Sequence, residues 1–296
     1  MPGCRMLSDE ECKIWQVEPE RFDEPGNERW LETITGEDTV VCVLGEHESQ
    51  SGEAASRAFL TLPEEQQLFF EKIAKRTRNI VTVVITGRPL DLRRISEKSR
   101  AVIMAWRPGT MGAVVDIVYG RTNPSGKLAV SIPWCVGQVP VSYWDIKTGH
   151  IYDADHPENR FSSRYMDIPN TPLYPFGFGL SYTEFNISDI EVQAGPDKRV
   201  HVHCKVSNTG KVAGAEVVQC YYETLCSSVV RPRKELVRFQ RVFLEPGEKK
   251  TVDFSIDREE FSYYDENMEI VCSQMKLRIS IGNSSDHEWG NSVIFV

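Results

Sequence analysis

The sequence lacks any long apolar run, and none approaches the ~20 consecutive apolar residues that a transmembrane helix needs. Its start, Met1 to Arg5, also lacks the apolar centre of a secretory signal. We therefore expect a chain that does not act at a membrane and that stays in the cytoplasm.

Positive charge is in short supply: 34 lysines and arginines stand against 43 aspartates and glutamates, so the formal net charge is -9. Binding to nucleic acid requires a basic patch that neutralises phosphates, and an anionic membrane surface makes the same demand. The balance argues against both partners. It is compatible with a neutral substrate such as a sugar.

The eight cysteines include no Cys-x-x-Cys pair, which argues against a structural zinc site. Cys42, Cys204 and Cys220 lie within apolar runs, where a free cysteine behaves as a small buried hydrophobe. The glycines show neither the Gly-x-Gly-x-x-Gly nor the Walker spacing of nucleotide sites. We expect reduced cysteines, no metal and no cofactor.

Residues 39–135 alternate apolar strand-like runs with helical patterns, which predicts a parallel sheet with helices on both faces. The runs are continuous rather than alternating, as expected of strands that are buried on both sides. A helix should begin at Thr61 to Glu64 with a capping box, and another should cover 112–119. The predicted strands are 39–44, 80–85, 101–106 and 127–132.

The flanking regions differ in character. Residues 1–38 are polar and contain one helical stretch near 28–33, so we expect an irregular segment of a truncated domain. Residues 136–183 are rich in proline and aromatics, which predicts an ordered connection packed across the first domain. From 184 to 296 the period is two, with turn signals between short strands, which predicts a fibronectin type III-like β-sandwich.

The loop after the first apolar strand carries the densest set of reactive side chains. Ligands bind at the carboxyl ends of strands in open parallel sheets, so this loop is the first place to look for a site. It is too long and too charged for a mere connection. Its candidates are Glu46, His47, Glu48, Glu53 and Arg57.

At these residues the chain resembles glycoside hydrolase family three, especially bacterial β-glucosidases. Several segments match the family in order and at similar intervals, from about residue 38 to the end. They are Gly45 to Arg57, Thr86 to Leu90, Trp106 to Gly112, Asn123 to Leu128, and Tyr174 to Tyr182. The sandwich is similar to the fibronectin-like domain that ends many members.

The resemblance implies retaining hydrolysis of β-linked sugars, in which one carboxylate attacks the anomeric carbon and another protonates the leaving oxygen. Family members take the nucleophile, an aspartate, from a preceding (β/α)₈ barrel, and the acid/base from this loop. That acid/base position falls on Glu53, with Glu46 as the rival. Glu46 adjoins the strand end, which favours a role in fixing the loop through backbone hydrogen bonds.

Other side chains near the loop have two interpretations each. Arg57 would either hold a substrate hydroxyl or form a structural ion pair, and the ion pair is the commoner role. Trp106 and Trp144 would stack on sugar rings or close a core, and aromatics at strand ends more often close a core. His47 has no partner that the sequence identifies.

The chain departs from the family in one large respect. A barrel of roughly 250 residues should precede this region, and the opening strand and helix of the second domain are also absent. We expect the isolated chain to be inactive or incomplete, with a β-glucoside substrate and a separate barrel-containing chain as partners. The alternative is a non-catalytic carbohydrate-binding or interaction module, or an inactive remnant of such an enzyme.

Overall fold

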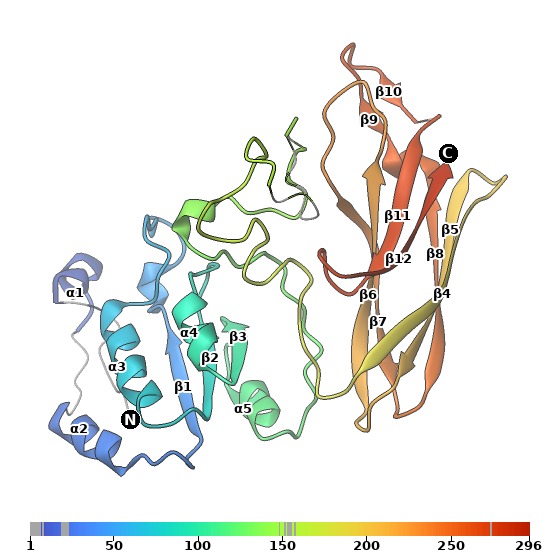
Figure 1. Cartoon of the computed structure of the whole chain (residues 1–296). Helices are drawn as coiled ribbons and strands as arrows, with labels where there is room; N and C mark the ends of the chain where they lie inside the picture. The colour runs from blue at the N-terminus through green and yellow to red at the C-terminus, as the bar shows by residue number, and fades with distance from the viewer. Residues whose placement is uncertain are drawn as a thin grey trace. The chain divides into compact units, whose positions relative to one another are not determined.

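The computed structural model describes residues 7, 9–18, 24–147, 149–150, 152, 156, 158–272 and 274–296. The chain forms two compact units, which Figure 1 colours from blue to green and from green to red. The first comprises Met1–Arg121 and Ile132–Val139, and the second comprises Thr122–Ser131 and Pro140–Val296. No helix within the described ranges is long and apolar enough to cross a bilayer.

The first unit is an α/β layer structure around a parallel sheet whose strand order, among the described residues, is β1-β2-β3. Strand pairing is in register, with Val40 opposite Ile80 and Val81 opposite Ala101. Three of the four predicted strands are therefore confirmed within one residue. The elements are α1 (Asp9–Trp15), α2 (Glu24–Thr33), β1 (Val40–Gly45), α3 (Glu64–Ala74), β2 (Ile80–Ile85), α4 (Arg93–Lys98), β3 (Ala101–Trp106) and α5 (Gly112–Val118).

The helices differ from expectation at several points. The described part of residues 1–38 is not irregular, because it contains α1 and α2. The predicted capping box is absent: α3 begins at Glu64 after Pro63, and Thr61 instead forms a parallel bridge with Asp91. Helix α4 was not predicted, since its six residues are too few to show a period.

The sheet is covered unevenly. In β1, Val40, Cys42 and Leu44 are buried, whereas Val41 and Val43 on the other face are 45% and 54% exposed. The prediction that this strand is buried on both faces is therefore wrong for the residues described. Among the described strands, β1 lies at the edge of the sheet and pairs with β2 alone. A continuous apolar run suits a strand that is covered on both faces, and the described residues cover only one face of β1.

The predicted strand at 127–132 does not form, and most of this segment belongs to the second unit. Leu128 exchanges backbone hydrogen bonds with the segment 177–178, and Lys127 forms a 2.7 Å ion pair with the buried Glu216. Asn123 donates to the carbonyl of Ala213 at 2.9 Å. These tertiary partners outweigh the local strand pattern.

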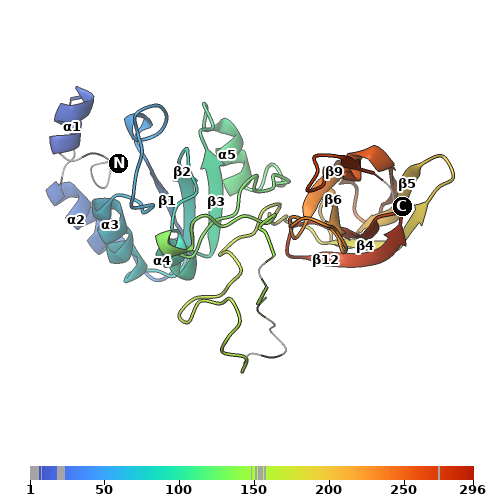
Figure 2. The same ribbon diagram turned by 90° about the horizontal axis from the view of Figure 1, so that it is seen from above.

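The second unit is a sandwich of two antiparallel sheets, seen nearly end-on in Figure 2. The sheet orders are β12-β11-β6-β7 and β4-β5-β8, with a small β10-β9 ribbon. Its strands are β4 (Phe185–Ala194), β5 (Arg199–Asn208), β6 (Gly214–Thr224), β7 (Glu235–Leu244), β8 (Lys249–Asp257), β9 (Tyr263–Tyr264), β10 (Ile270–Val271), β11 (Lys276–Gly282) and β12 (Glu288–Phe295).

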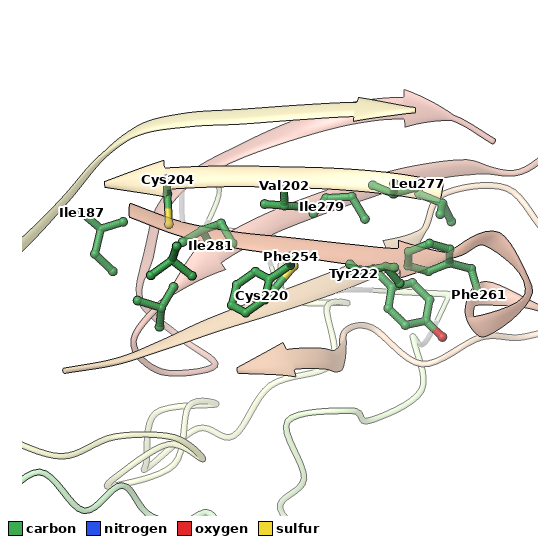
Figure 3. Packing of buried hydrophobic residues seen from close by; sticks show 14 of the residues in the cluster. Ile187, Val202, Cys204, Cys220, Tyr222, Phe254, Phe261, Leu277, Ile279 and Ile281 are labelled. Atoms are coloured by element: carbon green, nitrogen blue, oxygen red, sulfur yellow. The ribbon is translucent and has the colours of Figure 1, made fainter. Parts of the chain in front are cut away.

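Both inner faces of the sandwich contribute to one apolar core. Figure 3 shows Cys204, Cys220 and Phe254 among the side chains that fill the space between the strands. Leu277 and Ile279 of this core are fully buried. The predicted fibronectin-like sandwich is confirmed, and period-two burial along β8 is its clearest sign.

The sequence predicted that the aromatic connection packs across the first domain, but residues 140–183 of it belong to the second unit. Tyr143 stacks on Phe176 at 4.3 Å between ring centroids and meets Tyr221 edge-on at 5.8 Å. Gln219 donates from its side-chain amide to the carbonyl of Gly177 at 3.1 Å. These contacts explain why Tyr221 is buried although it lies on the outer face of its sheet.

Candidate active site

The candidate site lies where the three parallel strands of the first unit end. The loop that follows β1 meets Thr86 and Arg88 after β2, and Arg107 after β3. The structure thus brings together residues that are up to 61 positions apart in sequence. This is the edge at which parallel sheets bind ligands.

Glu46 is buried at the centre of this edge, with 1% of its surface exposed. Its carboxylate accepts a 2.6 Å hydrogen bond from the Thr86 hydroxyl. It also forms ion pairs with Arg57 at 3.0 Å and Arg88 at 3.1 Å. A carboxylate so enclosed and so fully bonded is a structural anchor, because removing any partner would leave a buried charge.

Arg88 ties the loop together at two points. Its Nη2 group donates to the carbonyl of Ala55 at 2.8 Å and to the carbonyl of Gln50. These two residues bracket the loop tip 51–54, so one guanidinium closes the base of that tip. Arg107 adds weaker bonds to the carbonyls of Glu46 and His47, at 3.4 and 3.2 Å.

The first turn of the loop is capped by its own side chains. His47 Nδ1 accepts from the backbone of Ser49 at 3.2 Å, and the Gln50 side chain accepts from the backbone of His47 at 3.0 Å. The result is a capped 3₁₀ turn over Glu48–Gln50. Gln50 also donates to Glu11 on α1 at 2.9 Å. His47 therefore has a structural role that the sequence did not reveal.

Two glycines permit the close approach of the strand ends. A Cβ atom on Gly45 would lie 1.9 Å from the carbonyl oxygen of Ile85, and one on Gly87 would lie 1.8 Å from the Ser51 hydroxyl. On the outer edge, the Gln66 side-chain amide pairs with both backbone groups of Gly45, each at 2.8 Å. These contacts fix the point at which the loop leaves the sheet.

Glu53 lies at the tip and is exposed. Its neighbours Gly52 and Ala54 both have positive φ angles, of 117° and 59°, which turn the backbone sharply on each side. Ala54 is strained there, since non-glycine residues rarely adopt this conformation. Among the described residues, no hydrogen bond or ion pair engages the Glu53 carboxylate, which leaves it available to an incoming group.

The predicted site residues thus separate into two groups. Glu46 and Arg57 lie together in the ion-pair network. Glu46 also makes the backbone bonds expected of it, since its N–H donates to the carbonyl of Ile85 at 2.9 Å. Glu53 stands apart from that network at the exposed tip. Of the aromatics, Trp106 is half-buried at the end of β3 and Trp144 belongs to the second unit, where it is 56% exposed.

Sequence reasoning missed the roles of Thr86, Arg88 and Gln66. Thr86 and Arg88 were recognised only as part of a matching segment, although they follow β2 directly and the strand-end argument applies to them equally. Gln66 had no signal, because a helix residue that bonds a strand edge is visible only in three dimensions. Within the described ranges, no three His, Cys, Asp or Glu side chains gather as metal ligands would.

Comparison with known proteins gives two matching families. The model described as glycosyl hydrolase family 3 C-terminal domain matches residues 15–182. The model described as fibronectin type III-like domain matches residues 216–285. Together they span both units of the chain.

Individual relatives agree with these matches. A periplasmic beta-glucosidase of Salmonella typhimurium is 40% identical over 84% of this chain, and a thermostable beta-glucosidase B of Acetivibrio thermocellus is 37% identical over 84%. The crystal structure of a Listeria innocua beta-glucosidase in complex with glucose superposes with a TM-score of 0.87 at 35% identity, covering 93% of this chain. The matches cover 33%, 34% and 39% of those proteins, so the chain spans about a third of their length.

Proposed function

The chain belongs to glycosyl hydrolase family 3, whose C-terminal domain it carries, and from that membership we propose that Glu53 is the general acid/base of a retaining β-glycosidase. The substrate would be a β-linked glucoside or a related sugar. The nucleophile would come from a barrel domain that the described chain does not contain.

One observation carries the proposal: the two candidate glutamates lie in opposite environments. Glu46 is buried and bonded to Thr86, Arg57 and Arg88, so it has no free oxygen to present to a substrate. Glu53 is exposed on a tip whose base Arg88 closes. An acid catalyst must be accessible to the leaving oxygen and must be held in a fixed position. Of the two glutamates, only Glu53 meets both requirements.

The chemistry assigned to Glu53 has two steps. The protonated carboxyl donates its proton to the glycosidic oxygen while the nucleophile attacks the anomeric carbon, so the glycosidic bond breaks and a glycosyl ester forms. The Glu53 carboxylate then takes a proton from water, which attacks the same carbon and releases the sugar. An acid catalyst needs a raised pKa, which burial against substrate and a second carboxylate would supply in the assembled site.

The uneven sheet supports the need for a completing part. The open edge of β1 and the exposed Val41 and Val43 form an apolar strip that water solvates poorly. A neighbouring element of a barrel-containing partner would cover this strip. The partner would thereby gain a defined position relative to the loop that carries Glu53.

The test is to produce the chain together with a barrel domain of the family and to measure hydrolysis of phenyl β-glucoside. With Glu53→Ala, we expect kcat/KM to fall by about 10²–10⁴-fold, since that is the contribution of a general acid. The loss should be much smaller for 2,4-dinitrophenyl β-glucoside, whose leaving group departs without protonation. Added azide should restore turnover by replacing water and should yield a glycosyl azide.

Glu48→Ala is the matched control, because Glu48 is another exposed glutamate of the same loop. It should leave both substrates unaffected. An unchanged rate in Glu53→Ala would remove Glu53 from the mechanism. Absence of hydrolysis by the unsubstituted pair would favour a non-catalytic module or an inactive remnant.

A further inference from the structure

A concave region lies at the edge of the parallel sheet opposite to the candidate active site, where the strands begin. It is an open depression of about 490 Å³, formed by the turn before β1, the connection from α3 to β2, and the residue before β3. This volume falls within the range of small-molecule sites, which is roughly 300–1,000 Å³. Six-residue strands separate it from the candidate active site by about 20 Å.

The depression is strongly positive in a chain of net negative charge. Lys75, Arg76, Arg78 and Arg100 line it, against the single carboxylate of Glu37. All four cations are exposed, and among the described residues none forms an ion pair. Clefts lined by charge of one sign concentrate the field and attract counter-ions.

Nearby cations of the same unit behave differently. Lys72 pairs with Glu28, and both Arg94 and Lys98 pair with Glu71. These three cations are therefore neutralised by carboxylates, whereas the four around the depression form no ion pair with the described residues. Lys75 and Arg76 follow α3 and also offset the negative end of its dipole, but that account does not extend to Arg78 and Arg100, which precede strands.

The backbone beneath these side chains is well bonded. The buried Thr77 hydroxyl donates to the carbonyl of Asp38 at 2.8 Å and lies 3.4 Å from that of Gly36. Asn79 donates from its side-chain amide to the same Gly36 carbonyl at 3.3 Å. The floor of the depression is therefore formed before any ligand arrives, which lowers the entropic penalty of binding.

We propose that this depression binds a small, multiply charged anion through Arg76, Arg78 and Arg100. Guanidinium groups bind carboxylate, sulfate and phosphate through paired hydrogen bonds, so the ligand must carry at least two such groups. The site is separate from the proposed acid/base and does not depend on it.

Calorimetric titration at low salt tests the proposal with three anions: a heparin-derived tetrasaccharide, trigalacturonate and inorganic tripolyphosphate. Neutral cellotetraose serves as the uncharged control and should not bind. At least one anion should bind, and its affinity should fall about tenfold between 50 and 200 mM salt, as a ligand held by several charges requires. The anion that binds identifies its chemistry as sulfated, carboxylated or phosphorylated.

The double variant R78E/R100E should weaken binding at least tenfold. Its matched control, K211E/K249E, makes the same change in net charge at exposed lysines of the second unit and should stay within twofold. Equal losses in the two variants would overturn the proposal, because net charge alone would then explain binding. Absence of binding by all three anions would overturn it as well.

A measurement on the unsubstituted chain guards against variants that fail to fold. Phenylglyoxal labels free arginines, so the bound anion should protect Arg76, Arg78 and Arg100 and leave Arg93 unprotected. Uniform protection would contradict the proposal. Light scattering provides a further check. Salt-sensitive dimers that dissociate when the anions are added would also contradict the proposal, because an acidic region of a second copy would then occupy the depression.

Discussion

The sheet of the first unit and the sandwich of the second differ in how they bury their strands. In the sandwich, inward residues of both sheets are almost fully enclosed, as with Val202, Phe254 and Leu277. In the first unit, β1 is covered on one face only, and much of the polar bonding gathers at the strand ends around Glu46. The sandwich thus depends on apolar burial, whereas the first unit depends in addition on an ion-pair network.

The largest expected effect on stability comes from the closed core. Leu277→Ala should lower the free energy of unfolding of the second unit by about 3 kcal/mol, because it leaves a cavity in a fully buried position. Its counterpart Leu68→Ala, on α3, removes a side chain that is 51% exposed and should cost under about 1 kcal/mol. Urea unfolding measures both. Equal losses would show that the two environments do not differ as described.

The network at the strand ends should come next. Glu46→Gln keeps the shape but removes the charge that faces Arg57 and Arg88. We expect a loss of about 2 kcal/mol, less than for a fully buried pair because both arginines retain some contact with water. Hydrogen exchange of the peptide 46–57 should also accelerate. Glu48→Gln in the same loop is the control, and a similar loss there would mean that the network is not what holds the loop.

A pH titration distinguishes the two units through their buried thiols. Burial raises the pKa of Cys204 to about 11 and that of Cys220 to about 12. Above pH 9, thiols of the unfolded chain lose protons that the folded sandwich retains, so stability present below pH 9 declines as pH rises toward 11. The free energy of unfolding should fall by roughly 1 kcal/mol per pH unit for each thiol.

In the first unit, burial raises the pKa of one described thiol, Cys42, to about 12. The stability of that unit should therefore decline less steeply as pH rises. Urea midpoints between pH 8 and 10.5 measure both slopes, and C204A/C220A should flatten that of the second unit. If that double substitution left the slope unchanged, the buried thiols would not be the cause of the pH dependence.

The smallest effect is expected on the open face of the first unit. Val43→Ala should change stability by less than about 0.5 kcal/mol, since the side chain is 54% exposed. Val83 lies opposite Val43 in the sheet register but is 1% exposed, so Val83→Ala should cost about 2 kcal/mol. Thermal unfolding compares the pair. A large loss of stability in Val43→Ala would show that another part of this chain covers the exposed face of β1.

Much of the fold could be predicted from the sequence because hydrophobic period reports burial directly. The strands at 80–85 and 101–106 were predicted at their observed bounds, and the alternation after 184 indicated the sandwich. The run 39–44 was also predicted, but its open face was not. A continuous apolar run looks the same whether the covering element belongs to the described chain or to something else.

Other features depended on tertiary contacts that no local pattern encodes. The segment 127–132 has the composition of a strand. Lys127 nevertheless forms an ion pair with Glu216 in the second unit, whereas the parallel sheet belongs to the first. At the candidate site, the loop and its two glutamates could be identified from position and resemblance. Their different environments could not, because the burial of Glu46 depends on Arg88, a residue in the loop that follows the next strand.

The chain passes between its two units three times, after Arg121, after Ser131 and after Val139. No single cut therefore releases either unit with its whole sequence, and a sandwich excised from Pro140 onward would lack the 122–131 turn that carries Lys127. Recombination that exchanges C-terminal domains between relatives would have to transfer two separate segments. We therefore expect the sequences of the two units to change in step.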